Sequence, residues 1–476
     1  MVFSSIEFGI FFVIVYALYL FASHRWQNRI LLVASAIFYG AWDWRFLFLL
    51  YASVTIVYFV GIEIAKAKTQ NSKKFFLFLS TLANLAILCF FKYFNFFALN
   101  LEPLLKWAGI SVNIHVLNLV LPVGISFYTF QAMSYTIDIY RGRLKPTRSY
   151  LPVALFVTFF PQLVAGPIER AEHLLPQVLQ ERKLRYDWFL EGLYLILWGL
   201  LEKVVVADNL AKIVDPIFAA PAPYDGLHIL IALYAFAFQI YCDFAGYSNM
   251  ARGLARLMGF DLMINFNLPY FSSSPRKFWQ RWHISFSSWL RDYLYIPLGG
   301  NRKGPLTTVR NLTITMLLAG LWHGAAWTFV SWGAYHGFLL IIHRFFEILF
   351  NLVPKIKNVI LYNGWCVLKT IFFFHLVCFG WLLFRAQSLS QVFQMSNALL
   401  YHCDFSNLVL VLPILKKFLL YVSLLITVQM IQFIKKDLFV VFRFKPAMQI
   451  CFYLVMLYSI LLLGVTTGEE FIYFQF

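Results

Sequence analysis

The sequence predicts an all-α polytopic membrane protein, and its composition, its apolar runs and the placement of its basic residues lead to that class. Of 476 residues, 61% are hydrophobic and only 13% are charged. A soluble domain needs a largely polar exterior, which so few charged residues cannot provide. Many apolar runs approach or exceed the ~20 residues that span ~30 Å of hydrocarbon. Helices are expected throughout, because a chain in lipid must satisfy its own backbone hydrogen bonds.

Clusters of Lys and Arg between the apolar runs define an expected topology. The first run, Phe8–Ala22, has its basic residues after it, which is typical of a retained transmembrane helix rather than of a cleaved signal peptide. If the basic clusters face the cytoplasm, about twelve crossings are expected and both termini lie outside. The later spans are expected near residues 188–206, 228–248, 311–329, 331–349, 364–384, 412–434 and 446–464.

Two stretches are expected to depart from regular spans. Residues 151–167 contain Pro161 and Gly166 between basic flanks, so this run should enter the membrane and return on the same side. Residues 252–310 are rich in Arg and Lys and should form a thick cytoplasmic layer. Without an internal repeat or a long linker, the chain is expected to be a single membrane domain, 1–476, with its core at 275–327 and an aromatic extracytoplasmic tail at 469–476.

The net charge of +17 is explained by positive cytoplasmic loops, so nucleic acid is not an expected partner, whereas membrane lipid is. The six cysteines form no CxxC pair. His336, His343 and His375 show no HExxH or comparable ligand spacing, so no metal site is expected. Asp138 and Asp243 lie at the ends of apolar runs and are expected to have structural roles.

His323 is the first candidate for chemistry. It lies in the apolar stretch GLWHGAAW, and an ionisable residue in a membrane span usually lines a cavity or pathway. The small residues beside it, Gly320 and Gly324 among them, allow another backbone or a ligand to approach closely. A neutral imidazole is suited to take a proton from a hydroxyl. The alternative is a packing histidine whose nitrogen is satisfied by a neighbouring carbonyl.

His283 is the second candidate, in the basic and aromatic stretch FWQRWHISFSSWLRDY. Basic side chains around it, and around the following loop LGGNRKG, are suited to hold the phosphates of an anionic donor. These residues are Arg276, Arg281, Arg291, Arg302 and Lys303. The alternative is an interfacial amphipathic helix, whose tryptophans lie at the headgroup level and whose arginines face lipid phosphate.

The last residues, GEEFIYFQF, form an aromatic tail. Its simplest role is an anchor at the membrane interface. The expected topology places Tyr473 on the outer side, where its phenol could act as a nucleophile beside a base.

These segments together resemble the membrane-bound O-acyltransferase superfamily. The similarity is carried by RWHISFSSWLRDYLYIPLGGNR and AGLWHGAAWTFVSWGAYHG, and also by VGISFYTFQAMSYTIDIYRG, FFPQLVAGPIER, YCDFAGYSNMARGLARLMG and FGWLLFRAQSL. It runs over nearly the whole chain. It is typical of the bacterial branch that O-acetylates alginate and peptidoglycan and D-alanylates teichoic acid.

The resemblance implies a ring of about 11–12 transmembrane helices, with re-entrant and interfacial helices, around a central cavity. It implies that His323 is the catalytic histidine and His283 the second histidine of the motif. It also implies a cytoplasmic acyl-CoA donor, acetyl-CoA here, with no bound cofactor. FIYFQF is similar to an aromatic motif that relays the acyl group in relatives, which makes Tyr473 the implied carrier.

The resemblance therefore implies an O-acetyltransferase of the bacterial inner membrane. It also implies that the acetyl group passes to an extracytoplasmic partner of the SGNH-hydrolase type, which modifies an exported polysaccharide. Two alternatives remain open: a lipid or protein acyltransferase of the same superfamily, and a transporter or flippase. A transporter would still move its substrate without His323, whereas the enzyme would lose acyl transfer.

Overall fold

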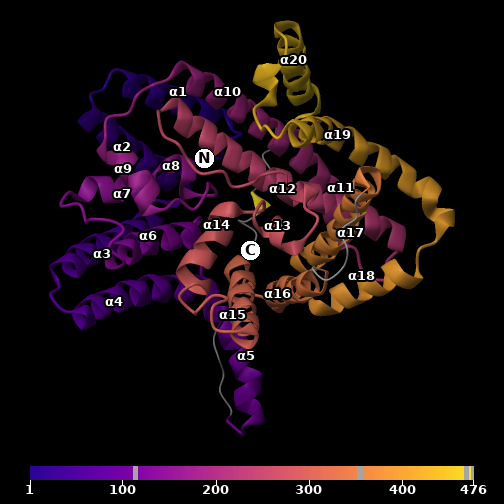
Figure 1. Cartoon of the computed structure of the whole chain (residues 1–476), viewed down its shortest axis with the longest axis horizontal. Coiled ribbons are helices and arrows are strands. Elements are labelled where there is room, and N and C mark those ends of the chain that lie inside the picture. The colour runs from indigo at the N-terminus through magenta and orange to yellow at the C-terminus, as the bar shows by residue number, and fades with distance from the viewer. Residues whose placement is uncertain (111–115, 351–357, 466–470, 473–476) are drawn as a thin grey trace. The chain divides into compact units, whose positions relative to one another are not determined.

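The computed structural model describes residues 1–110, 116–350, 358–465 and 471–472, and each regular element in those ranges is helical (Figure 1). Six helical stretches of these residues are long and apolar enough to cross a membrane. They are Phe46–Lys66, Gln70–Trp107, Gly226–Leu257, Val359–Arg385, Leu408–Lys435 and Pro446–Leu463. The predicted all-α polytopic class is confirmed. The count of about twelve crossings and the ring of helices stay predictions.

The chain divides into two compact units, residues 1–196 with 248–263 and residues 197–247 with 264–476. Helices α10 (Tyr186–Leu200) and α12 (Gly226–Leu257) contribute residues to both units. The expected single domain stays a prediction.

The first unit contains the helices drawn from indigo to magenta in Figure 1. Helices α3, α4 and α6 pack against one another, and α2 packs against α7. At Gly61 on α3, an added Cβ would lie 2.7 Å from the Tyr135 ring of α6, so glycine permits this close packing. The elements are α1 (Ile6–Leu20), α2 (His24–Asp43), α3 (Phe46–Lys66), α4 (Gln70–Leu88), the π-helical η1 (Cys89–Tyr93), α5 (Phe94–Trp107), α6 (Ile125–Tyr140), α7 (Tyr150–Thr158), α8 (Phe160–Leu163) and α9 (Ala171–Leu179).

The run expected to enter the membrane and return is a broken helix. Helix α7 ends at Thr158, Phe159 leaves the helical conformation, and α8 follows. Buried side chains satisfy the backbone at the break: the Phe160 N–H donates to Ser35 Oγ (3.1 Å), and the Phe156 carbonyl accepts from the amide of Gln131 (2.6 Å). The irregular backbone is therefore satisfied by protein, as expected.

The second unit is built around α15 (Pro305–His323) and α16 (Trp327–Phe350), which pack on each other, while α17 packs on α16. A π-helical segment, η2, contacts α11, α19 and α20. The other elements are η2 (Leu201–Ala207), α11 (Asp208–Ala219), η3 (Pro269–Phe271), α13 (Pro275–Trp279), α14 (Ile284–Leu290), the π-helical η4 (Arg291–Tyr295), α17 (Val359–Arg385), α18 (Leu389–Tyr401), η5 (Phe405–Asn407), α19 (Leu408–Lys435), η6 (Val440–Arg443) and α20 (Pro446–Leu463).

Two expected boundaries and one helix considered as an alternative differ from the structure. Helix α12 continues to Leu257, beyond the expected end at 248, because the buried small residues Ala251, Gly253 and Ala255 extend its packing face. The break expected between 329 and 331 lies instead at 324–326, where Gly324 adopts an extended conformation. The single interfacial helix considered for the stretch around His283 is divided into α13 and α14.

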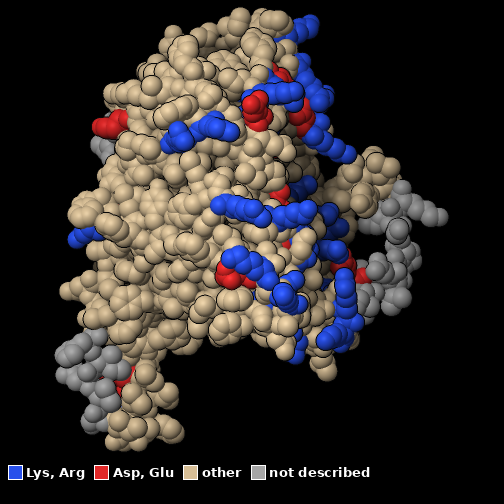
Figure 2. Space-filling view, turned by 90° about the vertical axis from the view of Figure 1, so that its left-hand side faces the viewer, with Lys and Arg blue, Asp and Glu red and all other residues tan. Residues whose placement is uncertain are grey.

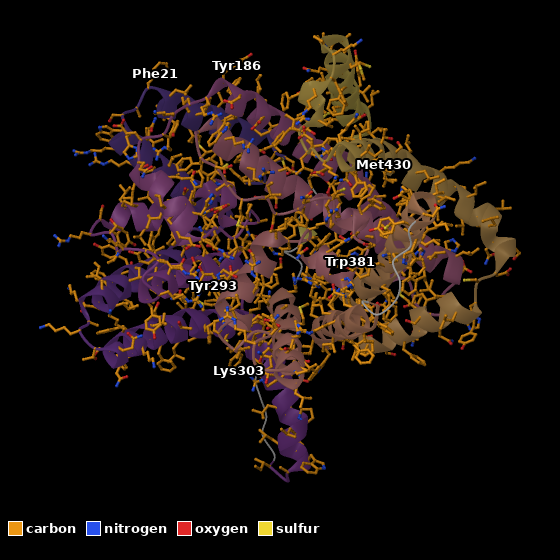
Figure 3. All side chains as sticks on the ribbon, viewed as in Figure 1. Phe21, Tyr186, Tyr293, Lys303, Trp381 and Met430 are labelled. Carbon is orange, nitrogen blue, oxygen red and sulfur yellow. The ribbon has the colours of Figure 1, made fainter. Side chains whose placement is uncertain are left out.

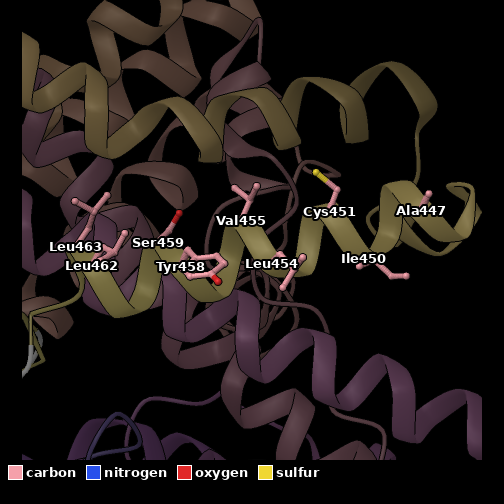
Figure 4. A pocket seen from close by; sticks show the side chains of 9 residues that line it. All are labelled: Ala447, Ile450, Cys451, Leu454, Val455, Tyr458, Ser459, Leu462 and Leu463. Carbon is pink, nitrogen blue, oxygen red and sulfur yellow. The ribbon is translucent and has the colours of Figure 1, made fainter.

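Helix α20 carries a shallow apolar groove (Figure 4). Only 6% of its membrane-length window is buried, so its sides are available to hydrocarbon. The groove is lined by Ile450, Leu454, Val455, Tyr458, Ser459 and Leu462, with neighbouring residues. Because most of its lining side chains are aliphatic, we do not regard it as a site of chemistry.

Candidate active site

His323 is the last residue of α15 and is 2% exposed. The chain changes direction at once, because Gly324 is extended and α16 begins three residues later. The imidazole is enclosed by aromatic rings, with Trp332 at 4.9 Å, Trp322 at 5.0 Å and Phe384 at 5.4 Å between ring centroids. Because His323 ends its helix, side chains from several elements surround its imidazole. Such surroundings are typical of a functional site rather than of a regular contact between two helices.

Glycines fix the position of His323 by allowing α15 and α16 to touch backbone to backbone. A Cβ added at Gly320 would lie 2.2 Å from the Phe329 carbonyl oxygen, and one at Gly333 would lie 2.2 Å from the Met316 carbonyl oxygen. Both distances are too short for any real side chain. The sequence expectation that Gly320 permits close approach of another backbone is confirmed.

His283 lies between α13 and α14 and is fully buried. Its backbone is left-handed, with φ 42° and ψ 55°, which is uncommon for a residue other than glycine. This conformation turns the chain so that the ring faces Phe244 at 4.6 Å and Phe286 at 5.0 Å. His283 lies outside the six candidate spans, and burial lowers the pKa of its imidazole well below the usual value. The ring is therefore neutral at physiological pH.

Asn265 fixes the orientation of the His283 ring. Asn265 Oδ1 lies 3.1 Å from His283 Nδ1 and accepts hydrogen bonds from the Ser285 hydroxyl (2.9 Å) and the Ser285 backbone N–H (3.3 Å). Because the backbone N–H is an obligate donor, the oxygen of the Asn265 amide must face this group. His283 Nδ1 then carries the proton, and Nε2 is the nitrogen that can accept one.

The two histidines lie together in the second unit. Their ring centroids are 6.4 Å apart, and Phe286 contacts both rings. The structure thus brings together the two residues that the sequence singled out from separate polar stretches. His336 lies nearby, 4.8 Å from the Trp332 ring that also contacts His323.

Most of the basic residues expected to hold a donor are exposed, whereas both histidines are buried. Arg276 is exposed and lies 3.7 Å from Glu347, and Arg291 is exposed and paired with Asp292 at 2.7 Å. Arg281 is partly buried, and its guanidinium donates to the Leu268 carbonyl (3.4 Å).

Arg302 and Lys303 lie on the exposed loop before α15, and no acidic partner of either is found in the described part of the chain. Figure 2 shows how such Lys and Arg side chains stand at the surface, and Figure 3 marks Lys303 on its loop and Trp381 among the interior aromatic side chains.

Tyr473, the expected acyl carrier, lies outside the described residues. The two residues before it are described: Phe471 is fully buried and Ile472 is 4% exposed. The Phe471 ring lies 5.7 Å from Phe244, which in turn contacts His283. The expected interfacial aromatic tail therefore enters the protein interior at these two positions.

Sequence reasoning missed Asn265, Ser285 and Trp332 as parts of the site, and also a buried lysine, Lys203. Asn265 lies in the unremarkable stretch MINFNLPYF, and only the left-handed turn at His283 brings it to the imidazole. Lys203 could have been found from the sequence, because the charged pair Glu202–Lys203 interrupts an otherwise apolar run.

Comparisons with known proteins agree on one family. A sequence model described as the membrane-bound O-acyltransferase family matches residues 29–384, which include both histidines. The probable alginate O-acetylase AlgI of Pseudomonas aeruginosa is 43% identical over 403 residues, covering 84% of this chain and 75% of that protein. The peptidoglycan O-acetyltransferase of Helicobacter pylori is 36% identical over 391 residues, covering 76% of this chain and 71% of that protein. The teichoic acid D-alanyltransferase of Bacillus subtilis is 29% identical over 282 residues, covering 57% of this chain and 70% of that protein.

Proposed function

The chain belongs to the membrane-bound O-acyltransferase family and is a membrane-embedded acyltransferase, and from this premise we propose that it O-acetylates an exported bacterial polysaccharide. The relatives named for alginate and peptidoglycan acetylation support this substrate class. Family membership answers the transporter alternative, because the protein is an enzyme. The named relatives also favour a polysaccharide over a lipid or protein acceptor.

The proposed reaction moves an acetyl group from the thioester of acetyl-CoA to a hydroxyl. The hydroxyl oxygen attacks the carbonyl carbon, a carbon–oxygen bond forms, and the carbon–sulfur bond breaks. The hydroxyl proton passes to an imidazole and from there to the departing thiolate. A thioester needs no further activation, so the protein has to provide a base, alignment and exclusion of water.

His323 is the proposed base, and one observation carries this assignment: two buried imidazoles lie 6.4 Å apart in an otherwise aromatic interior. Substrate groups between them would meet nitrogen atoms from two elements. The surrounding rings of Trp332 and Phe384 exclude water, which strengthens electrostatic interactions at the reacting atoms.

His283 is the proposed positioning partner. With Nδ1–H held by Asn265, its Nε2 accepts a hydrogen bond and does not donate one. Polarising the thioester carbonyl requires a hydrogen-bond donor, which Nε2 in this tautomer is not. This tautomer is better suited to align the attacking hydroxyl, or an N–H of the acyl-CoA, by accepting its hydrogen bond. The left-handed backbone and the Phe244 and Phe286 rings hold the imidazole in one orientation.

The donor is proposed to approach from the cytoplasmic side. Arg302 and Lys303 on the exposed loop before α15 are the best placed to attract its phosphates, because Arg276 and Arg291 already lie near carboxylates. In this proposal the acetyl group passes to Tyr473 and then to an extracytoplasmic SGNH-hydrolase-type partner. Both chain termini would lie outside the inner membrane, which places Tyr473 on the partner's side.

The test is acetyl transfer from labelled acetyl-CoA in membranes that contain the full chain and its polysaccharide acceptor system. His323→Ala should lower transfer by about 10²-fold to 10⁴-fold, the usual contribution of a general base. His402→Ala, at an exposed position after α18, is the matched control and should keep wild-type activity. Wild-type transfer by a correctly inserted His323→Ala protein would remove His323 as the base.

The relay is tested separately with Tyr473→Phe, which removes only the phenolic oxygen. Transfer of acetyl from acetyl-CoA to the polysaccharide should stop, while the protein remains folded and inserted in the membrane. Undiminished ester acetate on the polysaccharide with this variant would contradict the relay and leave the role of His323 intact.

A further inference from the structure

A buried charge cluster lies between η2 and α12 in the second unit. The Lys203 ammonium is 2.8 Å from Asp208 Oδ1 and 2.7 Å from Asp243 Oδ1, and the three side chains are at most 4% exposed. Burying three charges is costly and is tolerated only where each is compensated. The proposed acyl-transfer chemistry uses none of them, so the cluster calls for a separate explanation.

Two carboxylates, those of Asp208 and Asp243, face the one ammonium group of Lys203. The second oxygen of Asp243, Oδ2, accepts a hydrogen bond from the backbone N–H of Ile472 at 2.7 Å. A bond from a neutral N–H to a buried carboxylate is strong, because the acceptor is charged and the surroundings are apolar.

Two further bonds secure the chain just before this point. The Val465 N–H donates to the Val204 carbonyl (3.0 Å), and the Asn209 side-chain amide donates to the Leu463 carbonyl (2.8 Å). Val204 follows Lys203 in η2, and Asn209 follows Asp208 in α11. Described residues on each side of 466–470 are therefore bonded to the same part of the protein.

Aromatic contacts connect the residues beside this cluster with the candidate active site. The Phe471 ring packs on Tyr247 at 5.3 Å and on Phe244 at 5.7 Å, and Phe244 lies 4.6 Å from the His283 ring. Phe244 follows Asp243 directly in α12. One turn of α12 thus contacts both the C-terminal segment and His283.

We propose that Lys203, Asp208 and Asp243 are positioning residues, which hold the C-terminal segment by the Ile472 N–H and so place Phe471 beside Phe244 and His283. The carboxylate of Asp243 binds the segment, and Lys203 and Asp208 hold that carboxylate in place. The proposal rests on the proposed function in one respect: the segment is held in this position so that residue 473 can act as the acyl relay.

The experiment measures the position of the segment directly. Phe471→Cys and Tyr247→Cys are introduced together in a full chain whose native cysteines are replaced by alanine, and cross-linking by a short bifunctional thiol-reactive reagent is followed in membranes. The cross-link should form in this parent and with Ile472→Val, which keeps the N–H. Ile472→Pro removes that N–H and should lower the yield at least tenfold.

Asp243→Leu removes the acceptor and should lower the yield similarly. Asp243→Asn should keep the yield within about twofold, because its amide oxygen still accepts and Lys203 still faces Asp208. Equal yields with proline and valine at 472, or with leucine and asparagine at 243, would overturn the proposal. Absence of the cross-link in the parent would overturn it as well.

A kinetic readout separates positioning from general damage. With the native residues at 247 and 471, Ile472→Pro should lower kcat for transfer to the acceptor and leave the KM for acetyl-CoA unchanged. His323→Ala should lower transfer by about 10²-fold to 10⁴-fold yet keep the cross-link of the paired-cysteine chain. Failure of the base assignment and failure of the positioning proposal thus give different results.

Discussion

The imidazole ring of His283 lies 6.4 Å from that of His323, and the Phe286 ring touches both. One histidine precedes α14 and the other ends α15, so their spacing depends on a left-handed turn at one position and on a glycine contact at the other. The glycine contact at Gly320 and the hydrogen bond from the His283 ring to Asn265 can each be altered without replacing a histidine.

The first prediction concerns Asn265, whose side-chain oxygen faces three donors. Asn265→Leu keeps the volume but leaves buried donors without an acceptor, at a cost of about 1–3 kcal/mol for each unsatisfied group. It also releases the ring of His283. We expect kcat to fall about 10-fold to 100-fold, since ~1.4 kcal/mol corresponds to tenfold.

Ser285→Ala is the control for that change, because it removes one donor and leaves Asn265 bound to His283. Its kcat should stay within about threefold of wild type, given the modest net value of one hydrogen bond. Equal kinetics of the two variants would show that Asn265 does not orient the imidazole.

The second prediction concerns the contact of α15 with α16. Gly320→Ala places a Cβ 2.2 Å from a backbone carbonyl oxygen, so the helices must separate and His323 must shift. We expect destabilisation of at least about 1–3 kcal/mol from this overpacking, together with loss of transfer. Gly364→Ala, in open space on α17, should instead be neutral or stabilising by up to ~1 kcal/mol. Thermal unfolding in detergent checks both, and an unfolding midpoint for Gly320→Ala equal to wild type would contradict the close contact.

The third prediction concerns the exposed loop before α15. Reversing charge in Arg302→Glu/Lys303→Glu should raise the KM for acetyl-CoA about tenfold and leave kcat within about twofold, because an electrostatic approach site acts on binding. The increase should shrink at high salt, as surface electrostatics are screened. Lys445→Glu, an exposed reversal before α20, is the control. An unchanged KM in the double variant would place the donor phosphates elsewhere.

The fourth prediction concerns pH and lies in the first unit, outside the candidate spans. The hydrogen bond from His173 Nδ1 to Glu169 Oε2 (2.8 Å) raises the pKa of His173 above its usual value of 6.5. A raised pKa stabilises the folded state below the unfolded-state pKa, and this contribution is lost as pH rises through the folded-state pKa.

The difference in melting temperature between wild type and His173→Gln should therefore be larger near pH 5.5 than near about pH 9. Because the His173 side chain is 42% exposed, the difference should be small at either end. A difference that grows with rising pH would have the wrong sign for this pair.

Composition and apolar run length were sufficient to predict the helical membrane class, since both act through the solvent and do not depend on tertiary contacts. His283 and His323 were found because ionisable residues are rare in such a chain, and Gly320 because only glycine permits backbone contact. Their catalytic roles stay predictions. Helix ends were less accurate, as at His323, because the packing of Gly324 against Phe329 decides where α15 stops.

Contacts between residues that are far apart in the sequence could not be predicted from the sequence. Asn265 meets His283 only through a turn at an uncommon φ, and no local pattern indicates that a histidine will adopt it. Asp243 was expected to have a structural role, but its partners, Lys203 and the Ile472 N–H, come from distant positions in the chain. Such pairs follow from the three-dimensional path of the chain and not from spacing.

The left-handed backbone at His283 has an evolutionary consequence. Glycine or asparagine adopts φ near 42° with less strain, and a non-glycine residue held there costs of the order of 1–3 kcal/mol. Libraries of this gene selected only for thermal stability should therefore drift toward Gly or Asn at position 283. Libraries selected for acetyl transfer should retain histidine, and sequencing the two pools would show directly how much stability the protein gives up at this position for its activity.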